Sequence, residues 1–204
     1  MKTRALSLFT SVICIIAIAT ITTPTHAAKK TYALKTIKNK FIKIIVNDSK
    51  SEKGRFAIET VEGDLSRESD NNQPLIYGRP KPWTSYTTVL IDDKTYGFGG
   101  PTKRRSGKKL TYSDQVDQTV SKNSIITTSH YNKVVVSQKL SIYRSPITRV
   151  NDTALIHYQL KNNDSVTRNV GLRIMMDTLL GSNDGAPFRI GSQSYKLLKH
   201  PRFR

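Results

Sequence analysis

The stretch "DTALIHYQLKNND", residues 152–164, decides the fold class of this chain. Its residues divide into two sets at every second position, as side chains do along a β-strand. The sets are Ile156, Tyr158 and Leu160 on one face, and Leu155, His157 and Gln159 on the other. Asn and Asp residues that favour turns then end the stretch. The pattern predicts a strand with one buried face and one wetter face.

A second stretch with the same period, "RNVGLRIMMDT" at residues 168–178, follows directly. Its inward set is wholly apolar, whereas its outward set includes glycine, arginine and aspartate. The inward residues are Val170, Leu172, Ile174 and Met176, and the outward residues are Gly171, Arg173, Met175 and Asp177. Two such strands in succession indicate antiparallel sheets that each cover a core on one side.

Further strands are predicted upstream from short β-branched and aromatic runs that are separated by turn residues. They lie at residues 41–48, 54–64, 86–91, 96–98, 123–129 and 133–145, with hairpin turns at 49–53, 92–94 and 130–132. Residues 29–40 fit a strand or a helical stripe. Roughly nine or ten strands in all, with no convincing helix, predict an all-β fold, an antiparallel β-sandwich.

The first 27 residues have the layout of an export signal. Lys2 and Arg4 precede an apolar run from Ala5 to Ile21, and Ala27 supplies a small residue for cleavage. A membrane anchor is the alternative, but this apolar run is short for a span, which needs about 20 apolar residues. We therefore predict a cleaved signal at 1–27 and a protein in the periplasm, the cell envelope or the medium, with no transmembrane segment after cleavage.

Cleavage would remove Cys14, the one cysteine of the chain. The remaining protein would then have no disulfide, no catalytic thiolate and no zinc site built on cysteine. The three histidines after the signal have no metal-ligand spacing, so no metal site and no catalytic residue is predicted from them. Whether the protein is an enzyme stays open, with a binding role favoured.

The charge of the chain is strongly positive. Without Lys2 and Arg4 it has 31 cations against 15 acids, a net charge of +16. Such a charge favours anionic surroundings such as cell-wall polymers or acidic polysaccharide. The basic loop at 103–109 is the candidate polyanion site, through Lys103, Arg104, Arg105, Lys108 and Lys109. It has no interleaved aromatic residue, and the protein is predicted to be exported, so no nucleic acid is expected.

The predicted sandwich domain covers residues 28–188, and an irregular basic tail covers 189–204. The tail loses the alternation and contains cations but no acid. It is interpreted either as a basic surface tail or as the product of a reading frame cut or shifted after the last regular strand, which would leave the sandwich truncated. The second interpretation is motivated by the long apolar strand at 168–178, which would otherwise lie at a sheet edge.

Two stretches are candidate ligand sites. In "DTLLGSNDGAPF", residues 177–188, the composition indicates a turn. Asp177, Asn183 and Asp184 could also orient sugar hydroxyls or bind calcium, and no other cofactor is expected. In "YGRPKPWTSY", residues 77–86, prolines surround Trp83, which could stack on a sugar ring or close one end of the core.

The pair "ALIHYQLKNND…RNVGLRIMMDT" resembles paired strands of bacterial all-β supersandwich domains of the galactose-mutarotase-like type, over residues 150–188. The resemblance implies an association with carbohydrate, and no catalytic residue is carried over. The expected function is an exported binding protein for a glycan or an anionic polymer. The alternatives are a carbohydrate-active enzyme that uses Asp177 and Asp184, and an assembly protein that pairs through exposed strands. The oligomeric state stays open.

Overall fold

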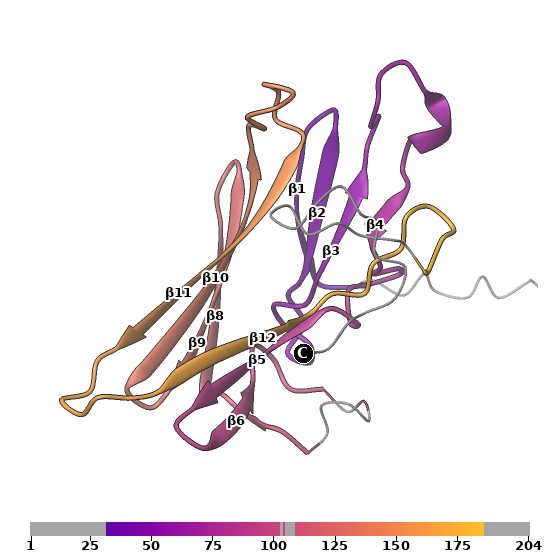
Figure 1. The fold of residues 1–204 in the computed structure, drawn as a ribbon. Coiled ribbons are helices and arrows are strands. Elements are labelled where there is room, and N and C mark those ends of the chain that lie inside the picture. The colour runs from indigo at the N-terminus through magenta and orange to yellow at the C-terminus, as the bar shows by residue number, and fades with distance from the viewer. Residues whose placement is uncertain (1–31, 103, 105–108, 186–204) are drawn as a thin grey trace, which may run out of the picture. The chain divides into compact units, whose positions relative to one another are not determined.

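The computed structural model divides the chain into two units, Met1–Thr31 and Tyr32–Arg204. It describes residues 32–102, 104 and 109–185, all in the second unit (Figure 1). The predicted export signal at 1–27 and the basic tail at 189–204 therefore lie outside the described residues, as do Lys103, Arg105 and Lys108.

The described residues form three four-stranded sheets and one short 3-10 helix. The first sheet has the order β1 (Leu34–Lys38), β2 (Ile42–Asn47), β3 (Phe56–Thr60) and β4 (Pro74–Ile76). The second has the order β11 (Thr153–Asn162), β10 (Val134–Tyr143), β9 (Ser124–Tyr131) and β8 (Gln115–Val120). The third has the order β12 (Val170–Met175), β5 (Tyr86–Ile91), β6 (Lys94–Gly97) and β7 (Thr111–Tyr112). The helix, η1, spans Glu68–Asp70 in the β3–β4 connection.

The three sheets form two layers. One face of the β11–β8 sheet covers both of the other sheets, as its inward residues pack into two core clusters. In the first cluster, Ile125 and Leu140 contact Phe56 and its neighbours in the β1–β4 sheet. In the second, Tyr131, Val134 and Val136 pack with Val89 of β5 and with Phe98, which directly follows β6. The all-β sandwich predicted from the sequence is confirmed.

The β1–β4 sheet and the third sheet are joined by the chain that follows β12. Beyond Met175 the backbone leaves β5 and pairs with β4, through a bridge between Ile76 and Thr178. The amide of Tyr77 donates to the carbonyl of Asp177, and the amide of Leu179 donates to that of Leu75. One long edge segment, residues 170–180, thus runs along both sheets (Figure 1).

Several predicted elements need correction. The 29–40 stretch contains a strand, β1, and no helix among its described residues. His130 belongs to strand β9, because the β9–β10 turn is only Asn132 and Lys133. Strands β4, β7 and β8 were not predicted, so the described strands number twelve. One pairing, between β6 and β7, is parallel.

Strand β3 is buried on both faces, although its pattern predicts one wet face. The face that carries Arg55, Ala57 and Glu59 is covered by the segment after β4. A Cβ atom added to Gly78 would lie 2.3 Å from that of Ala57, so the backbone there sits directly on the sheet. The covering segment is the proline-rich stretch that contains Trp83, which places this stretch against the sheet.

Candidate functional site

Trp83 lies in a compact cluster around a buried carboxylate. The guanidinium of Arg104 stacks on the Trp83 ring, 3.6 Å from its centroid. Arg104 Nε also donates to Glu52 Oε1 at 3.0 Å, and Lys81 Nζ lies 3.0 Å from Glu52 Oε2. Burial raises the pKa of Glu52, but the hydrogen bonds from Lys81 and Arg104 outweigh it and hold the pKa below 4.5. Two residues predicted for separate ligands, Trp83 and Arg104, thus contact each other.

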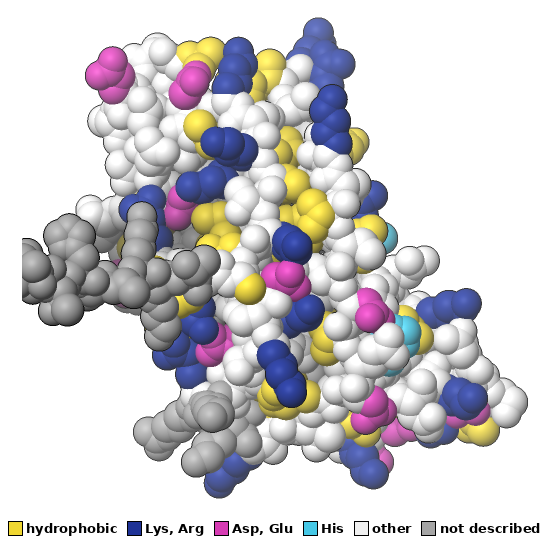
Figure 2. Space-filling model, turned by 180° about the vertical axis from the view of Figure 1, so that it is seen from behind, with side chains coloured by type: hydrophobic (Ala, Val, Ile, Leu, Met, Phe, Trp, Pro, Cys, Tyr) yellow, Lys and Arg dark blue, Asp and Glu magenta, His cyan; other side chains and the backbone are white. Residues whose placement is uncertain are grey.

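This arrangement is poorly suited to either predicted ligand. One face of the half-buried Trp83 ring is occupied by Arg104, which limits stacking of a sugar on it. Arg104 forms an ion pair with Glu52. Lys109, the other described cation of the basic loop, is exposed. Figure 2 shows cations spread over one whole face and interspersed with acids, so no single basic stripe forms there.

The 177–185 stretch forms a turn at the end of the long edge segment. Gly181 has a φ of 64°, and Leu180 and Asn183 form a bridge across the turn. The Asn183 side chain accepts a hydrogen bond from the amide of Gly185. Asp177 is half-buried, while Asn183 and Asp184 are exposed. This geometry agrees with the turn interpretation, since Asn183 has a local structural partner.

A pocket of about 440 Å³ opens at one end of the sandwich. Three connections converge on it, namely the β5–β6, β9–β10 and β11–β12 turns, together with β7 (Figure 1). Its lining includes three tyrosines, four aspartates and three cations: Tyr96, Tyr112, Tyr131, Asp92, Asp93, Asp114, Asp164, Lys94, Lys133 and Arg168. We call this the end pocket. None of the ligand residues predicted from the sequence lines it.

The aromatic wall of the end pocket is fixed by packing. Tyr131 is buried and donates its hydroxyl to the carbonyl of Gly97 at 2.9 Å. Its ring lies 5.3 Å from that of Tyr96, centroid to centroid, at an angle of 55°. Tyr96 and Tyr112 are half-buried, so part of each ring remains open. Tyr112 also interacts with the buried guanidinium of Arg55, which holds the Tyr112 side chain in place.

An ion network fixes the rim. Arg168 Nη1 donates to Asp92 Oδ2 at 3.0 Å, and its Nη2 donates to Asp164 Oδ2 at 2.5 Å. The amide of Asn169 donates to Asp92 Oδ1, and with Arg168 it lowers the pKa of Asp92. Asp93 and Asp114 are exposed and make no side-chain hydrogen bond or ion pair with a described residue. Two carboxylates are therefore held in place, and two are available for a ligand.

No protein-family model, curated protein or solved structure matches this chain. The chemistry of the end pocket must be judged from its own residues. Tyrosine faces pack on the apolar face of a sugar, and free carboxylates accept hydrogen bonds from hydroxyl groups. A concave site with an apolar wall and a few placed polar groups is typical of small-molecule sites.

The described part of the chain contains neither a cluster of metal-binding side chains nor a helix that could cross a membrane. Residues 32–102, 104 and 109–185 contain no group of three or more histidine, cysteine or acidic side chains placed to hold a metal ion. Among these residues no helix has the length and apolar character that crossing a membrane requires.

Gly97 supports the aromatic wall, and this leads to a stability prediction. A Cβ atom on Gly97 would lie 2.3 Å from Cε1 of Tyr112, so the ring must move. Gly97→Ala is expected to lower the free energy of unfolding by about 1–3 kcal/mol, as overpacking does. Gly171→Ala is the matched control, because its Cβ would meet Leu90 at an ordinary 3.6 Å. Urea unfolding of both variants measures the difference, and equal stabilities would contradict the packing described.

Proposed function

We propose that the protein is an exported binding protein for a neutral or amino-substituted saccharide and that the end pocket is its site. The observation that carries the proposal is the combination of half-open Tyr96 and Tyr112 rings with the unpaired carboxylates of Asp93 and Asp114 in one pocket. The predicted signal at 1–27 supports export, and the implied resemblance to carbohydrate-associated domains supports the ligand class.

The charge of the pocket distinguishes the two ligands considered from the sequence. Four carboxylates face three cations, and Arg168 is already paired with two of the four. With Lys94 and Lys133 counted against Asp93 and Asp114, the pocket has a net charge of −1, which disfavours an anionic polymer because like charges at short range are unfavourable. A neutral sugar avoids this cost, and an amino sugar gains an ion pair. The glycan is therefore the better ligand for this pocket, despite the positive charge of the whole chain.

The experiment is retention on a panel of insoluble glycans, followed by titration with soluble oligosaccharides released from the retained polymer. Tyr96→Ala is expected to weaken binding at least tenfold, which corresponds to about 1.4 kcal/mol. Asp93→Asn with Asp114→Asn should weaken it similarly, because one acceptor oxygen and the charge of each carboxylate are lost. Trp83→Ala and Asp184→Asn are the controls, and both should bind as the unchanged protein does.

Salt separates this proposal from adhesion to a polyanion. Contacts to neutral sugar hydroxyls are expected to survive 0.5 M NaCl, whereas exposed charge–charge contacts are screened within about a Debye length. Retention that disappears in salt and depends on Lys109 would support adhesion and contradict the saccharide site. Absence of retention on every polymer at low salt would also contradict it.

A further inference from the structure

Two sheet edges lie open on the same side of the sandwich. Strand β11 is the outer strand of one sheet and β12 the outer strand of the facing sheet. Tyr158 of β11 hydrogen-bonds Thr87 of β5, and Thr87 is paired with Ile174 of β12, so the two outer strands face each other across the core. Figure 1 looks onto this side, with β11 and β12 in front. Among the described residues no strand pairs with the outer edge of either.

The free edge of β11 presents backbone groups at its even-numbered residues. The amide of Asn163 donates to the carbonyl of Lys133 beside β10, so odd-numbered positions point toward β10. In an antiparallel ladder the alternate residues then direct N–H and C=O groups outward. Ile156, Tyr158 and Leu160 therefore offer three donors and three acceptors along one edge. The same three residues direct their side chains into the core.

The core is incompletely covered beside these edges. The inward side chains of Leu160, Ile174 and Met176 are 39%, 41% and 49% exposed. The alternation predicts all three as core residues, and none of them is buried. Edge strands with exposed apolar residues invite pairing with another chain. A strand added to β11 would satisfy its free backbone and cover Ile174 and Met176 with its own inward side chains.

Charge identifies the kind of strand that fits. Neither β11 nor β12 contains an acidic residue, whereas β11 contains His157 and Lys161 and β12 contains Arg173. On the outer face of the sheet, Lys139 of β10 lies opposite His157. A second copy of this chain would bring equal basic edges together, at a net charge of +18 per full chain, and like charges opposite each other disfavour a pair. A strand with acidic outward residues would instead gain attraction.

We propose that the free edge of β11 binds an extended segment of a partner protein that alternates apolar and acidic residues, which adds to the sheet as a strand. The recognition is strand addition, in which backbone hydrogen bonds provide affinity and alternate side chains provide specificity. The site is distinct from the end pocket, because Leu160, Ile174 and Met176 do not line that pocket.

The test uses the full chain and a fluorescein-labelled peptide of five Val-Glu repeats, blocked at both ends. Fluorescence anisotropy should show binding at least tenfold tighter than for a peptide of five Val-Lys repeats. It should also be tighter than for a peptide of the same composition with the valines grouped. Equal binding of the three peptides would overturn the proposal, because neither charge nor alternation would then matter.

Two variants locate the site. Leu160→Pro removes an outward N–H without breaking the ladder to β10, and Ile174→Glu places a like charge under the added strand. Each should weaken peptide binding at least tenfold. Val120→Glu, on β8 at the opposite edge of the same sheet, and Tyr96→Ala, in the end pocket, are the controls and should leave it within twofold. If Leu160→Pro still binds the glycan but no longer binds the peptide, the peptide site and the saccharide site are different.

A measurement on the unchanged protein removes any dependence on how the variants fold. Peptide binding should slow hydrogen exchange of the Ile156, Tyr158 and Leu160 amides at least tenfold. Unchanged exchange at these amides would overturn the proposal. So would sedimentation of the chain as a dimer that Ile174→Glu dissociates, since a second copy would then occupy the edge.

Discussion

Phe56→Ala is expected to lower the free energy of unfolding by about 3–5 kcal/mol, the largest effect of any single change considered. Phe56 has an exposed fraction of 0% and is among the largest side chains that are fully buried. It contributes to the first core cluster with Ile125 and Leu140 of the facing sheet. Truncation therefore loses the transfer free energy of the ring and leaves a cavity between the layers.

Tyr143→Ala is the matched control, because Tyr143 is an aromatic residue of β10 with an exposed fraction of 54%. Its loss should change the free energy of unfolding by less than about 0.5 kcal/mol, as for surface substitutions in general. Urea unfolding followed by circular dichroism measures both variants. If Phe56→Ala costs no more than Tyr143→Ala, the two layers do not pack as described.

Alternation identified the strands with one buried face. Strand β10 has such a face, and β11 has a half-buried one from Ala154 to Tyr158. Each was predicted within two residues of its bounds. Gln138, the polar exception on the inward face of β10, is buried and donates to the hydroxyl of Tyr158. One polar residue among the apolar inward residues of β10 does not hide the period, so the strand was still predicted.

The missed strands lack that signal for physical reasons. Strand β4 is only Pro74–Ile76, and β7 is only Thr111–Tyr112, too short for a period to show. Strand β8 lies at a sheet edge and none of its residues is buried, so its sequence is mostly polar. The buried polar face of β3 was also hidden, because a segment distant in the sequence covers it. Arg79, twenty positions from Glu59, pairs with it at 3.0 Å.

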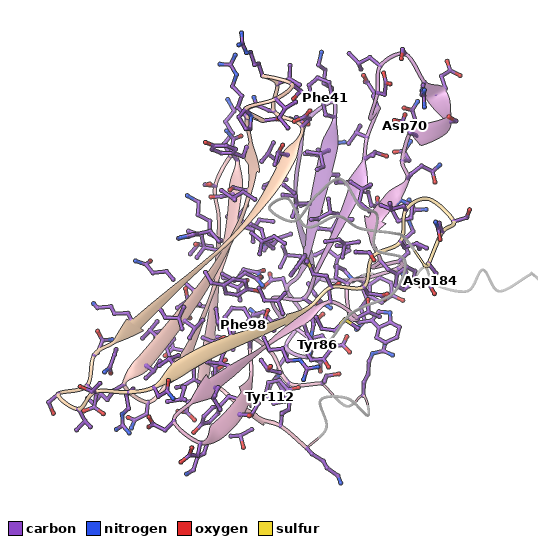
Figure 3. All side chains as sticks on the ribbon, in the orientation of Figure 1. Phe41, Asp70, Tyr86, Phe98, Tyr112 and Asp184 are labelled. Carbon is purple, nitrogen blue, oxygen red and sulfur yellow. The ribbon has the colours of Figure 1, made fainter. Side chains whose placement is uncertain are left out.

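The end pocket has no signal within any single turn of the sequence, because its residues come from several turns that are far apart along the chain. Asp92 and Arg168 are 76 positions apart, and each lies in a stretch whose composition indicates a turn. One signal was available. In an antiparallel sandwich, turns separated by an even number of strands lie at the same end. The β9–β10 and β11–β12 turns meet this condition, because the antiparallel β10 and β11 separate them, whereas the parallel β6–β7 pair breaks the count to the β5–β6 turn. Asp184 lies away from Tyr112 of the end pocket (Figure 3).

The second large effect concerns Glu52 and pH. Glu52→Gln is expected to lower the free energy of unfolding at pH 7 by about 1.5–3 kcal/mol, the range for a hydrogen bond to a charged group. The side chain of Glu52 is 6% exposed and contacts both Lys81 and Arg104. The amide of glutamine cannot replace the carboxylate toward two cations. Glu62→Gln is the control, because that side chain is exposed and has no described partner.

The pH dependence follows from the direction of the pKa shift. The pKa of Glu52 lies below 4.5 in the folded protein, as does that of Glu59, which pairs with Lys43 and Arg79. A lowered pKa contributes stability that is complete above the unfolded value and is lost as the pH falls through the folded value. Below about pH 4.5 the unchanged protein should therefore lose stability with falling pH more steeply than Glu52→Gln does. Urea unfolding between pH 7 and pH 3 measures the two curves, and they should converge at the acid end. Parallel curves would mean that the Glu52 carboxylate is not stabilised by Lys81 and Arg104.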